Sequence, residues 1–515
     1  MADSADIADH LHRADAPDPG TDTFDVIVIG GGPPGENVAQ YAIRGSDRTV
    51  VVVEKELVGG ECSYWACMPS KALLRPGEVL DSARNMPGVQ SLVGDASLDV
   101  AAVLARRDSF NSGLDDSSQI SWAAGLGIDV IRGTARLAGA KTVEVTGLDG
   151  AVRTLHARHA VVLGTGTTAT VPPIPGLADA RPWTSRDVTN LHVVPRRVVV
   201  VGGGVVACEA ATWLSALGVA ELTLIGSAPE LLARNEPFAG ALVRESLTGR
   251  GVTVLVGATV EKVQRENPAD TGYGQVHGGQ VTVTWSGSDG GGGTVTADEI
   301  VIATGRTPAS RDLGLDSIGL AGRVKDNHGY IEVDDHLTVT GVDGEWLYAI
   351  GDLNGRALLT HMGKYQGRLA GAVIGARAEG RPVDGAWFTD RADHDQVPQV
   401  TFTDPQVGSV GVTQEQAEQA GRKVRAVEYD MAALAGTALL RDGYTGRAKL
   451  VVDAEREVLL GATFAGPDIS DLVHAATVAV VGEVPLATLW HAVPSYPTPS
   501  EVWLRLLEAY YFPAG

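Results

Sequence analysis

The chain contains little cysteine, few aromatic residues and fewer basic than acidic residues. Three cysteines in 515 residues are too few for the dense, even set that holds small secreted domains together. No apolar run approaches the roughly 20 residues of a membrane helix, so we expect no membrane span. The formal net charge of −22 argues against nucleic acid or an anionic membrane as partner. Residues 1–22 are acidic and polar without a secretory signal, which predicts a disordered tail on a cytoplasmic protein.

A dinucleotide-binding βαβ unit is predicted at FDVIVIGGGPPGENVAQYAIRGSDRTVVVVE, residues 24–54. Gly30 permits a tight turn, Gly32 lets the backbone approach a pyrophosphate, and Gly35 allows close helix packing. Glu54 ends the second strand, where a carboxylate can receive ribose hydroxyls. The glycine pattern alone is a weak signal, but strand, helix and acid in register make an ordinary glycine loop a poor alternative.

A second unit of the same kind follows at RRVVVVGGGVVACEAATWLSALGVAELTLIG, residues 196–226. Gly202, Gly204 and Ala207 stand at the corresponding positions. The chain therefore has two predicted dinucleotide sites.

The end of the second unit's second strand bears on the choice of nicotinamide cofactor. Gly226 and Ser227 stand where the first unit has Glu54, so nothing there repels a 2′-phosphate. Arg234 lies a few residues on and is either a partner for that phosphate or a solvated surface residue. These residues mildly favour NADPH over NADH, and NADH remains the alternative.

Two of the three cysteines, Cys62 and Cys67, lie on the short segment GGECSYWACMPSK, residues 59–71. Half of a zinc site would need two further nearby ligands that the sequence does not offer, so we predict no metal site. On a regular helix five residues rise about 7.5 Å, so a disulfide between the two would strain the segment and be easily reduced. A position near a helix start is expected to lower a thiol pKa. Cys208 lies in an apolar stretch and is predicted to be a small buried side chain.

With two dinucleotide units, the C-x-x-x-x-C-x-P-S-K segment and a terminal module of alternating strands and helices, the chain resembles the class I flavoprotein disulfide reductases. This family includes glutathione reductase, dihydrolipoamide dehydrogenase and mercuric reductase. The resemblance implies an α/β fold with two Rossmann-like domains, one for FAD and one for NAD(P), and a C-terminal α+β dimerisation domain of a homodimer. The predicted parts are a tail (1–22), the FAD domain (23–178, continued in 307–390), the NAD(P) domain (179–306) and the dimerisation domain (391–515).

The resemblance also implies roles for individual residues. The implied FAD-binding residues are Gly30, Gly32, Gly35, Glu54, Gly60, Thr165, Gly166, Gly351 and Asp352. The implied NAD(P)-binding residues are Gly202, Gly204, Ala207, Ser227, Arg234 and Gly305. Lys71 and Glu209 match an ion pair beside the flavin, where a cation stabilises the reduced ring. Cys62 matches the thiol that attacks the substrate disulfide, and Cys67 matches the thiolate that lies against the flavin.

The sequence departs from the family at the proton-transfer group. Tyr496 stands where disulfide-exchanging members have a histidine, and Glu501 matches the glutamate that orients it. A phenol with a pKa near 10 is a poor base at neutral pH. His491, five residues upstream, is either a substitute base or a packing residue. Ser63 to Ala66 introduce Tyr64 and Trp65 between the cysteines, which either reshape the substrate mouth or pack against the FAD domain.

Three functions are consistent with these residues. The first is an FAD-dependent NAD(P)H:disulfide oxidoreductase that reduces a small disulfide or, in reverse, oxidises a dithiol of the dihydrolipoamide type. The second keeps the flavin and dithiol but reduces a metal ion or a quinone, which the missing histidine permits, although the C-terminal vicinal cysteines of mercuric reductases are absent. The third is a non-catalytic redox sensor, which would not need two complete nucleotide sites.

Overall fold

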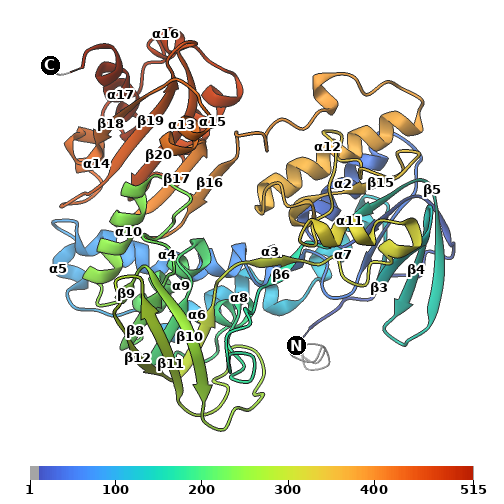
Figure 1. Cartoon of the computed structure of the whole chain (residues 1–515), viewed down its shortest axis with the longest axis horizontal. Coiled ribbons are helices and arrows are strands. Elements are labelled where there is room, and N and C mark those ends of the chain that lie inside the picture. The colour runs from blue at the N-terminus through green and yellow to red at the C-terminus, as the bar shows by residue number, and fades with distance from the viewer. Residues whose placement is uncertain (1–10, 514–515) are drawn as a thin grey trace. The chain divides into compact units, whose positions relative to one another are not determined.

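The computed structural model describes residues 11–513, which form two compact units (Figure 1). Unit 1 comprises residues up to Pro69, Asp108–Thr168 and Arg306–His394. Unit 2 comprises Ser70–Arg107, Ala169–Gly305 and the residues from Asp395 onward. Within residues 11–513, no helix combines the length and the apolar character required to cross a membrane.

Unit 1 is an α/β unit built on a six-stranded sheet in the order β1-β2-β3-β4-β5-β15, in which β1 also pairs with β5. Its strands are β1 (Thr23–Ile29), β2 (Val50–Glu54), β3 (Ile128–Gly139), β4 (Thr142–Gly147), β5 (Val152–Leu163) and β15 (Leu347–Ala349). The short strands β14 (Arg306–Pro308) and β6 (Thr167–Ala169) pair with each other. Its helices are α2 (Pro33–Ile43), α3 (Gly60–Tyr64), α7 (Ser117–Gly125), α11 (Ala321–Asp326) and α12 (Thr360–Ala378), with short 3₁₀ turns η1 (Ser112–Leu114), η2 (Leu315–Ile318), η3 (Gly351–Asn354) and η4 (Ala386–Phe388).

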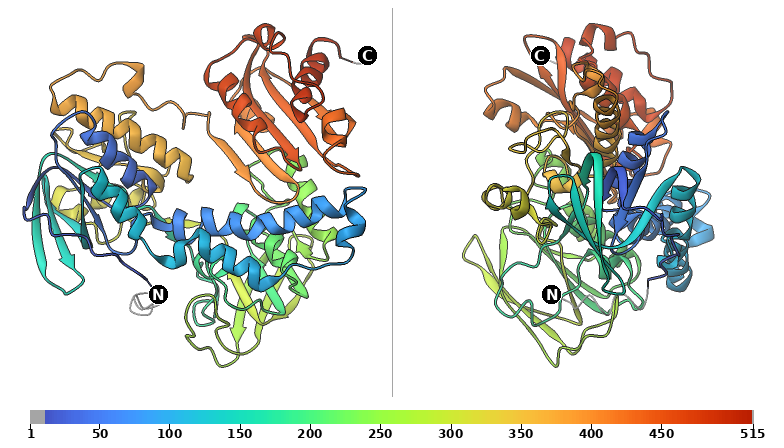
Figure 2. Two further views of the ribbon diagram at one scale, coloured as in Figure 1. Left: turned by 180° about the vertical axis from the view of Figure 1, so that it is seen from behind. Right: turned by 90° about the vertical axis from the view of Figure 1, so that its right-hand side faces the viewer.

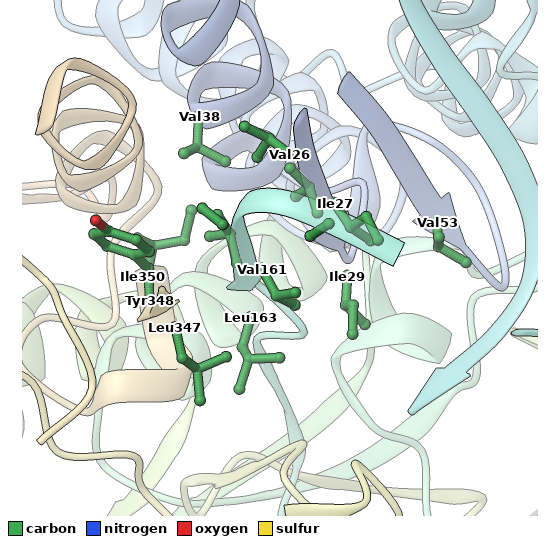
Figure 3. Close-up of a cluster of buried hydrophobic side chains, with 14 of the residues drawn as sticks. Val26, Ile27, Ile29, Val38, Val53, Val161, Leu163, Leu347, Tyr348 and Ile350 are labelled. Atoms are coloured by element: carbon green, nitrogen blue, oxygen red, sulfur yellow. The ribbon is translucent and has the colours of Figure 1, made fainter. Parts of the chain in front are cut away.

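The core of unit 1 lies where its parallel strands meet. β2 is the run VVVVE and β1 contains VIVI, and such apolar runs are typical of parallel strands that are covered on both faces. β1 pairs in parallel with β2 and β5, and β15 pairs in parallel with β5. Figure 3 shows part of the resulting cluster, which includes Val26, Ile27, Val161, Leu163 and Ile350. The ends of β1 and β15 therefore share one rigid edge.

Glycines in α12 allow this helix to pack closely on α2 (Figure 1). A Cβ at Gly367 would lie 2.6 Å from the carbonyl oxygen of Pro34, and one at Gly371 would lie 2.6 Å from the Cβ of Tyr41. Residues four apart share a helix face, so these two glycines remove side chains from the contact side of α12. A Cβ at Gly363, in the first turn of α12, would likewise lie 2.6 Å from Pro34, so the first turns of the two helices meet.

Unit 2 begins with helical segments and continues into the second predicted nucleotide unit. α4 (Cys67–Arg84) and α6 (Val100–Phe110) run across the unit boundaries, and α5 (Gln90–Val93) and α8 (Ser185–Thr189) are short helices. The four-stranded parallel sheet has the order β13-β7-β8-β9, from β13 (Glu299–Ile302), β7 (Arg197–Val201), β8 (Glu221–Ile225) and β9 (Thr253–Leu255), with helices α9 (Val205–Ala216) and α10 (Pro237–Gly249). A three-stranded antiparallel sheet consists of β10 (Ala258–Arg265), β11 (Val281–Gly287) and β12 (Gly292–Ala297).

The terminal part of unit 2 is an α+β module, seen clearly in Figure 2. Its antiparallel sheet has the order β16-β17-β20-β19-β18, from β16 (Pro398–Thr401), β17 (Gln406–Gly411), β20 (Val458–Gly466), β19 (Arg447–Asp453) and β18 (Val424–Asp430). Its helices are α13 (Gln414–Gln419), α14 (Ala435–Ala438), α15 (Leu472–Val481), α16 (Leu486–Leu489) and α17 (Val502–Tyr511), with 3₁₀ turns η5 (Met431–Ala433) and η6 (Pro499–Glu501). Apolar residues of α15 and α17 pack on this sheet in one buried cluster.

The two compact units do not coincide with the predicted parts, since most of the predicted NAD(P) domain and most of the predicted dimerisation domain fall in unit 2. Residues 70–107 group with the nucleotide part of unit 2, whereas the sequence placed them in the first domain. Residues 11–22, predicted as a disordered tail, make ordered contacts in unit 1: Arg153 binds Asp18 at 2.8 Å, and His156 N–H donates to the Asp22 carbonyl at 2.8 Å. The rest of the predicted tail, residues 1–10, lies outside the described residues.

Candidate functional site

The first glycine turn leaves its backbone bare on one side. Gly30 has φ of 106°, and a Cβ there would lie 2.4 Å from the carbonyl oxygen of Gly164. A Cβ at Gly35 would lie 2.0 Å from the carbonyl oxygen of Gly30, so only glycine fits at this helix–strand contact. At Gly32 the nearest atom to a Cβ is 3.9 Å away, which leaves the open approach that a pyrophosphate requires.

Glu54 lies beside this turn, as the sequence predicts. Its Oε2 accepts a hydrogen bond from Gly31 N–H at 2.7 Å, and its Oε1 accepts one from Glu56 N–H at 2.7 Å. Burial raises the pKa of Glu54 above its usual value. α2 starts with Pro33 and Pro34, which carry no N–H, so this helix start has fewer backbone donors for an anion than usual.

A second turn of unit 1 joins the same region. The Cβ of an alanine at Gly351 would lie 2.8 Å from Pro34, so the start of η3 closely approaches the start of α2. Asp352 Oδ2 accepts a hydrogen bond from Thr167 Oγ1 at 2.7 Å and lies 3.9 Å from Arg306 Nε. Burial raises the pKa of Asp352. A carboxylate at this position can hold a ligand hydroxyl.

The remaining predicted residues of the first cofactor site also lie on the turns of unit 1. Thr165 Oγ1 donates to the carbonyl of Ala309 at 2.8 Å, and Gly166 has φ of 68°. Gly60 begins α3, and a Cβ there would lie 2.8 Å from the Cα of Gly32. Unit 1 therefore brings together a bare glycine turn and two carboxylates, which is the donor and acceptor set that fits FAD.

The two cysteines are adjacent thiols in this structure. Cys62 lies in α3, Cys67 begins α4, and neither is in a disulfide. Cys67 Sγ lies 3.3 Å from Thr360 Oγ1, at the start of α12. The hydrogen bond with Cys67, followed by burial, raises the pKa of the Cys62 thiol. The pKa of Cys62 therefore shifts in the direction opposite to the one expected of a thiol near a helix start, and the causes are the neighbouring thiol and burial.

The aromatic residues between the cysteines point into unit 1. Tyr64 and Trp65 are both buried and make an edge-to-face contact with ring centroids 5.7 Å apart. Tyr64 Oη donates to the carbonyl of Val58 at 2.9 Å. Of the two alternatives for these residues, packing within the FAD-type domain is therefore the one that the structure supports.

The second glycine turn, in unit 2, repeats the geometry of the first. Gly202 has φ of 134°, and a Cβ there would lie 2.3 Å from the carbonyl oxygen of Ala303. A Cβ at Gly204 would meet nothing within 4 Å, and Ala207 is buried in α9. These are the features that a bound dinucleotide requires of this turn.

The remaining residues predicted around this second turn lie at the surface. Ser227, Arg234 and Gly305 are exposed, and Gly305 has φ of 137°. Cys208 is fully buried in α9, as the sequence predicts, and burial raises the pKa of its thiol.

Lys71 and Glu209 form an ion pair within unit 2. Lys71 Nζ lies 2.8 Å from Glu209 Oε2, and Glu209 Oε1 accepts a hydrogen bond from Phe402 N–H at 2.9 Å. The ammonium group also lies 4.8 Å from the centroid of the Phe402 ring. The carboxylate is almost fully buried, so the pair holds Lys71 in one position.

The three predicted site residues near the C-terminus differ in their exposure. Tyr496 is 74% exposed and His491 is also exposed. Glu501 is buried, and its Oε1 accepts a hydrogen bond from Arg505 at 2.6 Å. In the structure Glu501 therefore pairs with Arg505, whereas the sequence predicted that Glu501 orients the group at position 496.

Sequence reasoning missed several residues at the site. They include Thr360 at Cys67, Arg306 at Asp352 and Gln366, whose Oε1 accepts the Gly351 N–H at 2.8 Å. No local pattern identifies them, because their partners are distant in the sequence. Within residues 11–513, no group of three or more His, Cys, Asp or Glu side chains could hold a metal ion.

Comparison with known proteins places these observations in context. The model of the pyridine nucleotide-disulphide oxidoreductases matches residues 24–367, and that of their dimerisation domain matches residues 397–506. A dihydrolipoyl dehydrogenase of Chlorobaculum tepidum is 33% identical over 93% of this chain and 95% of its own length. A mercuric reductase of Bacillus cereus is 28% identical over 94% of this chain and 71% of its own length. The solved structure of the Cu(II) complex of HOCl-induced flavoprotein disulfide reductase RclA from Escherichia coli shares the fold, with a TM-score of 0.77, 23% identity and coverage of 95% and 99%.

Proposed function

Because the chain belongs to the pyridine nucleotide-disulphide oxidoreductases, which are FAD-dependent enzymes that use a pyridine nucleotide, we propose that it reduces a small disulfide with NADPH through the Cys62–Cys67 pair. Bound NADPH and FAD would supply two electrons, and the Cys62–Cys67 disulfide would take them up with two protons to become a dithiol. The dithiol would then reduce the substrate disulfide to two thiols and close again to the Cys62–Cys67 disulfide. Dihydrolipoamide-type chemistry is the same path in reverse.

The observation that carries this proposal is the hydrogen-bonded pair of thiols at the junction of α3 and α4. The hydrogen bond with Cys67, followed by burial, raises the pKa of Cys62. This supports Cys67 as the thiolate that faces the flavin and Cys62 as the thiol that attacks the substrate. Thr360, at 3.3 Å from Cys67 Sγ, is positioned to donate to that thiolate.

The cofactor residues act as binding and orienting groups in this proposal. Glu54 and Asp352 hold hydroxyl groups of FAD, whose ring supplies the two-electron chemistry. The Lys71–Glu209 pair supplies a fixed positive charge that favours the reduced ring. Ser227 and Arg234 are exposed beside the second turn and provide a polar surface for a 2′-phosphate, which supports NADPH over NADH.

A second candidate function differs from the first in the molecule that accepts the electrons. Cys62 needs a base before it can attack a disulfide, because its pKa is raised. Tyr496 replaces the family's histidine and is largely exposed. A metal ion or a quinone requires no proton transfer to a leaving thiol, so such an acceptor is the alternative to a disulfide. A redox sensor is a weaker candidate because both nucleotide turns have the geometry of binding sites.

The assembly we propose is a homodimer of a cytoplasmic enzyme. The match to the dimerisation domain over residues 397–506 supports it. Several apolar side chains of this part are exposed in the single chain, among them Leu439, Val478, Val481 and Val493. Their burial against a second subunit would be favourable.

The proposal is tested by anaerobic stopped-flow reduction of the FAD-loaded protein with NADPH or NADH, followed by mixing with disulfides, mercuric ion or quinones. We expect rapid reoxidation by a disulfide in the parent protein and its loss in Cys62→Ser. Cys208→Ser is the matched control, because it removes the one cysteine outside the Cys62–Cys67 pair, and it should react like the parent. Reoxidation by quinones or metals alone that survives Cys62→Ser would refute the thiol pathway.

A further inference from the structure

Two short segments that are far apart in the sequence, β6 and β14, lie side by side in the structure. The pairing continues beyond the strands, since Ala309 N–H donates to the carbonyl of Gly166 at 2.9 Å. It places the side chain of Arg306, the first residue of β14, against Thr167, the first residue of β6. The Thr167 side chain is buried. Arg306 therefore lies beside the turn that carries two of the predicted FAD-binding residues.

The hydrogen bonds from Arg306 run in one direction, toward Asp352. Arg306 Nε donates to Thr167 Oγ1 at 2.6 Å, and its NH2 group donates to the Thr167 carbonyl at 2.7 Å. Thr167 Oγ1 in turn donates to Asp352 Oδ2 at 2.7 Å. A guanidinium group has donors and no acceptor, so the Thr167 hydroxyl must accept from Arg306 and direct its own proton at the carboxylate. Asp352 Oδ2 is therefore a hydrogen-bond acceptor.

This arrangement opposes the effect of burial on Asp352. Burial raises the pKa of Asp352, whereas the Thr167 hydroxyl and the Arg306 charge lower it. An ionised carboxylate has only acceptors, so Oδ1 can accept a hydroxyl of a ligand while Oδ2 accepts the hydroxyl of Thr167. A protonated carboxyl would place a donor on one of these two oxygens and would lose one of the two hydrogen bonds.

Glu61 is the second carboxylate that Arg306 contacts. The NH2 group of Arg306 also donates to Glu61 Oε2, and Glu61 precedes Cys62 in α3. The charge of Glu61 raises the pKa of Asp352. Arg306 therefore compensates two carboxylates, one in the helix of Cys62 and one in the turn that is predicted to bind FAD.

We propose that Arg306 and Thr167 are positioning residues that hold Asp352 as the acceptor for a hydroxyl group of FAD. This inference rests on the proposed function and deepens it, because it concerns how the same site holds its cofactor. Both residues act through Asp352: Thr167 orients the carboxylate with a directed hydroxyl, and Arg306 fixes the direction of that hydroxyl and supplies the compensating charge.

The first test compares Thr167→Val with Thr167→Ser in the full-length, FAD-loaded protein. Release of FAD on dilution, followed by flavin fluorescence at pH 7.5, gives the dissociation constant. Valine has a similar shape to threonine but no hydroxyl, so this variant should bind FAD about tenfold more weakly, the change typical of one hydrogen bond to a charged group. Serine keeps the hydroxyl, so Thr167→Ser should bind FAD like the parent.

The second test uses the two charged groups that act on Asp352, which are Arg306 of β14 and Glu61 of α3. Arg306→Gln removes the charge that lowers the pKa of Asp352, so the affinity for FAD should fall several-fold more between pH 7.5 and pH 5 than in the parent. Glu61→Gln removes the charge that raises this pKa, so the affinity should fall less than in the parent. Arg311→Gln is the matched control, because Arg311 is exposed five residues beyond Arg306, and its pH dependence should equal that of the parent.

Equal FAD affinity in Thr167→Val and the parent would overturn the inference, and so would equal losses in Thr167→Val and Thr167→Ser, because the hydroxyl would then have no part in binding. Changes of the pH dependence in the same direction in Arg306→Gln and Glu61→Gln would also overturn it, since a merely structural role does not depend on the sign of the charge removed. Failure of the proposed function is recognised separately, as a lack of reoxidation by disulfides in a parent protein that binds FAD.

Discussion

Replacing Asp390 with asparagine should change how the stability of unit 1 depends on pH. The side chains of Asp390 and Asp393 are both buried, and Arg356 NH1 lies 3.7 Å from one and 3.5 Å from the other. Burial, followed by the neighbouring Asp393 carboxyl, raises the pKa of Asp390 to about 8. Two carboxylates close together in a buried site cannot both ionise easily, so the folded protein retains a proton there.

The sign of the effect follows from this proton. Between about pH 4 and pH 8 the folded chain binds a proton that the unfolded chain, with an aspartate pKa near 3.8, has released. The free energy of unfolding therefore falls as pH rises through this range, by about 1.4 kcal/mol per pH unit. Asp390→Asn keeps a neutral side chain of similar shape and removes this titration. Relative to the parent, the variant should become more stable by roughly 2 to 3 kcal/mol between pH 5.5 and pH 7.5.

Guanidinium unfolding at pH 5.5, 6.5 and 7.5 measures this difference from the transition midpoints and slopes. Asp384→Asn is the matched control, because Asp384 is exposed in the same segment and should follow the parent curve. If the curves of Asp390→Asn and the parent remain parallel across this range, Asp390 does not titrate there and the reasoning is wrong.

Three further predictions concern the nucleotide sites. Glu209→Gln should slow flavin reduction by NADPH about tenfold, because Lys71 loses the carboxylate that lies 2.8 Å from its ammonium group. Stopped-flow absorbance measures this rate, and an unchanged rate would mean that the ion pair has no part in flavin reduction. Gly35→Ala should weaken FAD binding by at least about tenfold, because the added Cβ would lie 2.0 Å from the Gly30 carbonyl oxygen. The FAD content of the variant after dialysis measures the loss, and full retention of FAD would contradict the prediction. Arg234→Ala should raise the KM for NADPH several-fold and leave that for NADH unchanged, whereas a lower KM for NADH in the parent would oppose the assignment.

Local patterns predicted the elements that can be recognised from neighbouring residues. Strand, glycine turn, helix and strand follow one another within about thirty residues in both nucleotide units, and each glycine's role is dictated by its own backbone. The predictions of the fold class and the cofactor FAD are confirmed by the family match.

The sequence by itself determined the two dinucleotide units, the spacing of Cys62 and Cys67 and the substitution of Tyr496 for a histidine, because each is a property of a short segment. Only the tertiary structure decided what surrounds them. It placed Thr360 at Cys67 and raised the pKa of Cys62 through a neighbouring thiol and burial. It also packed Leu11 on the cluster of Tyr64 and Trp65 and brought Ala14 to Asp116. The contacts of Asp116 with Ala14 and of Thr360 with Cys67 join residues about 100 to 300 positions apart, and hydrogen bonding and burial depend on which side chains meet in space rather than on their order in the chain.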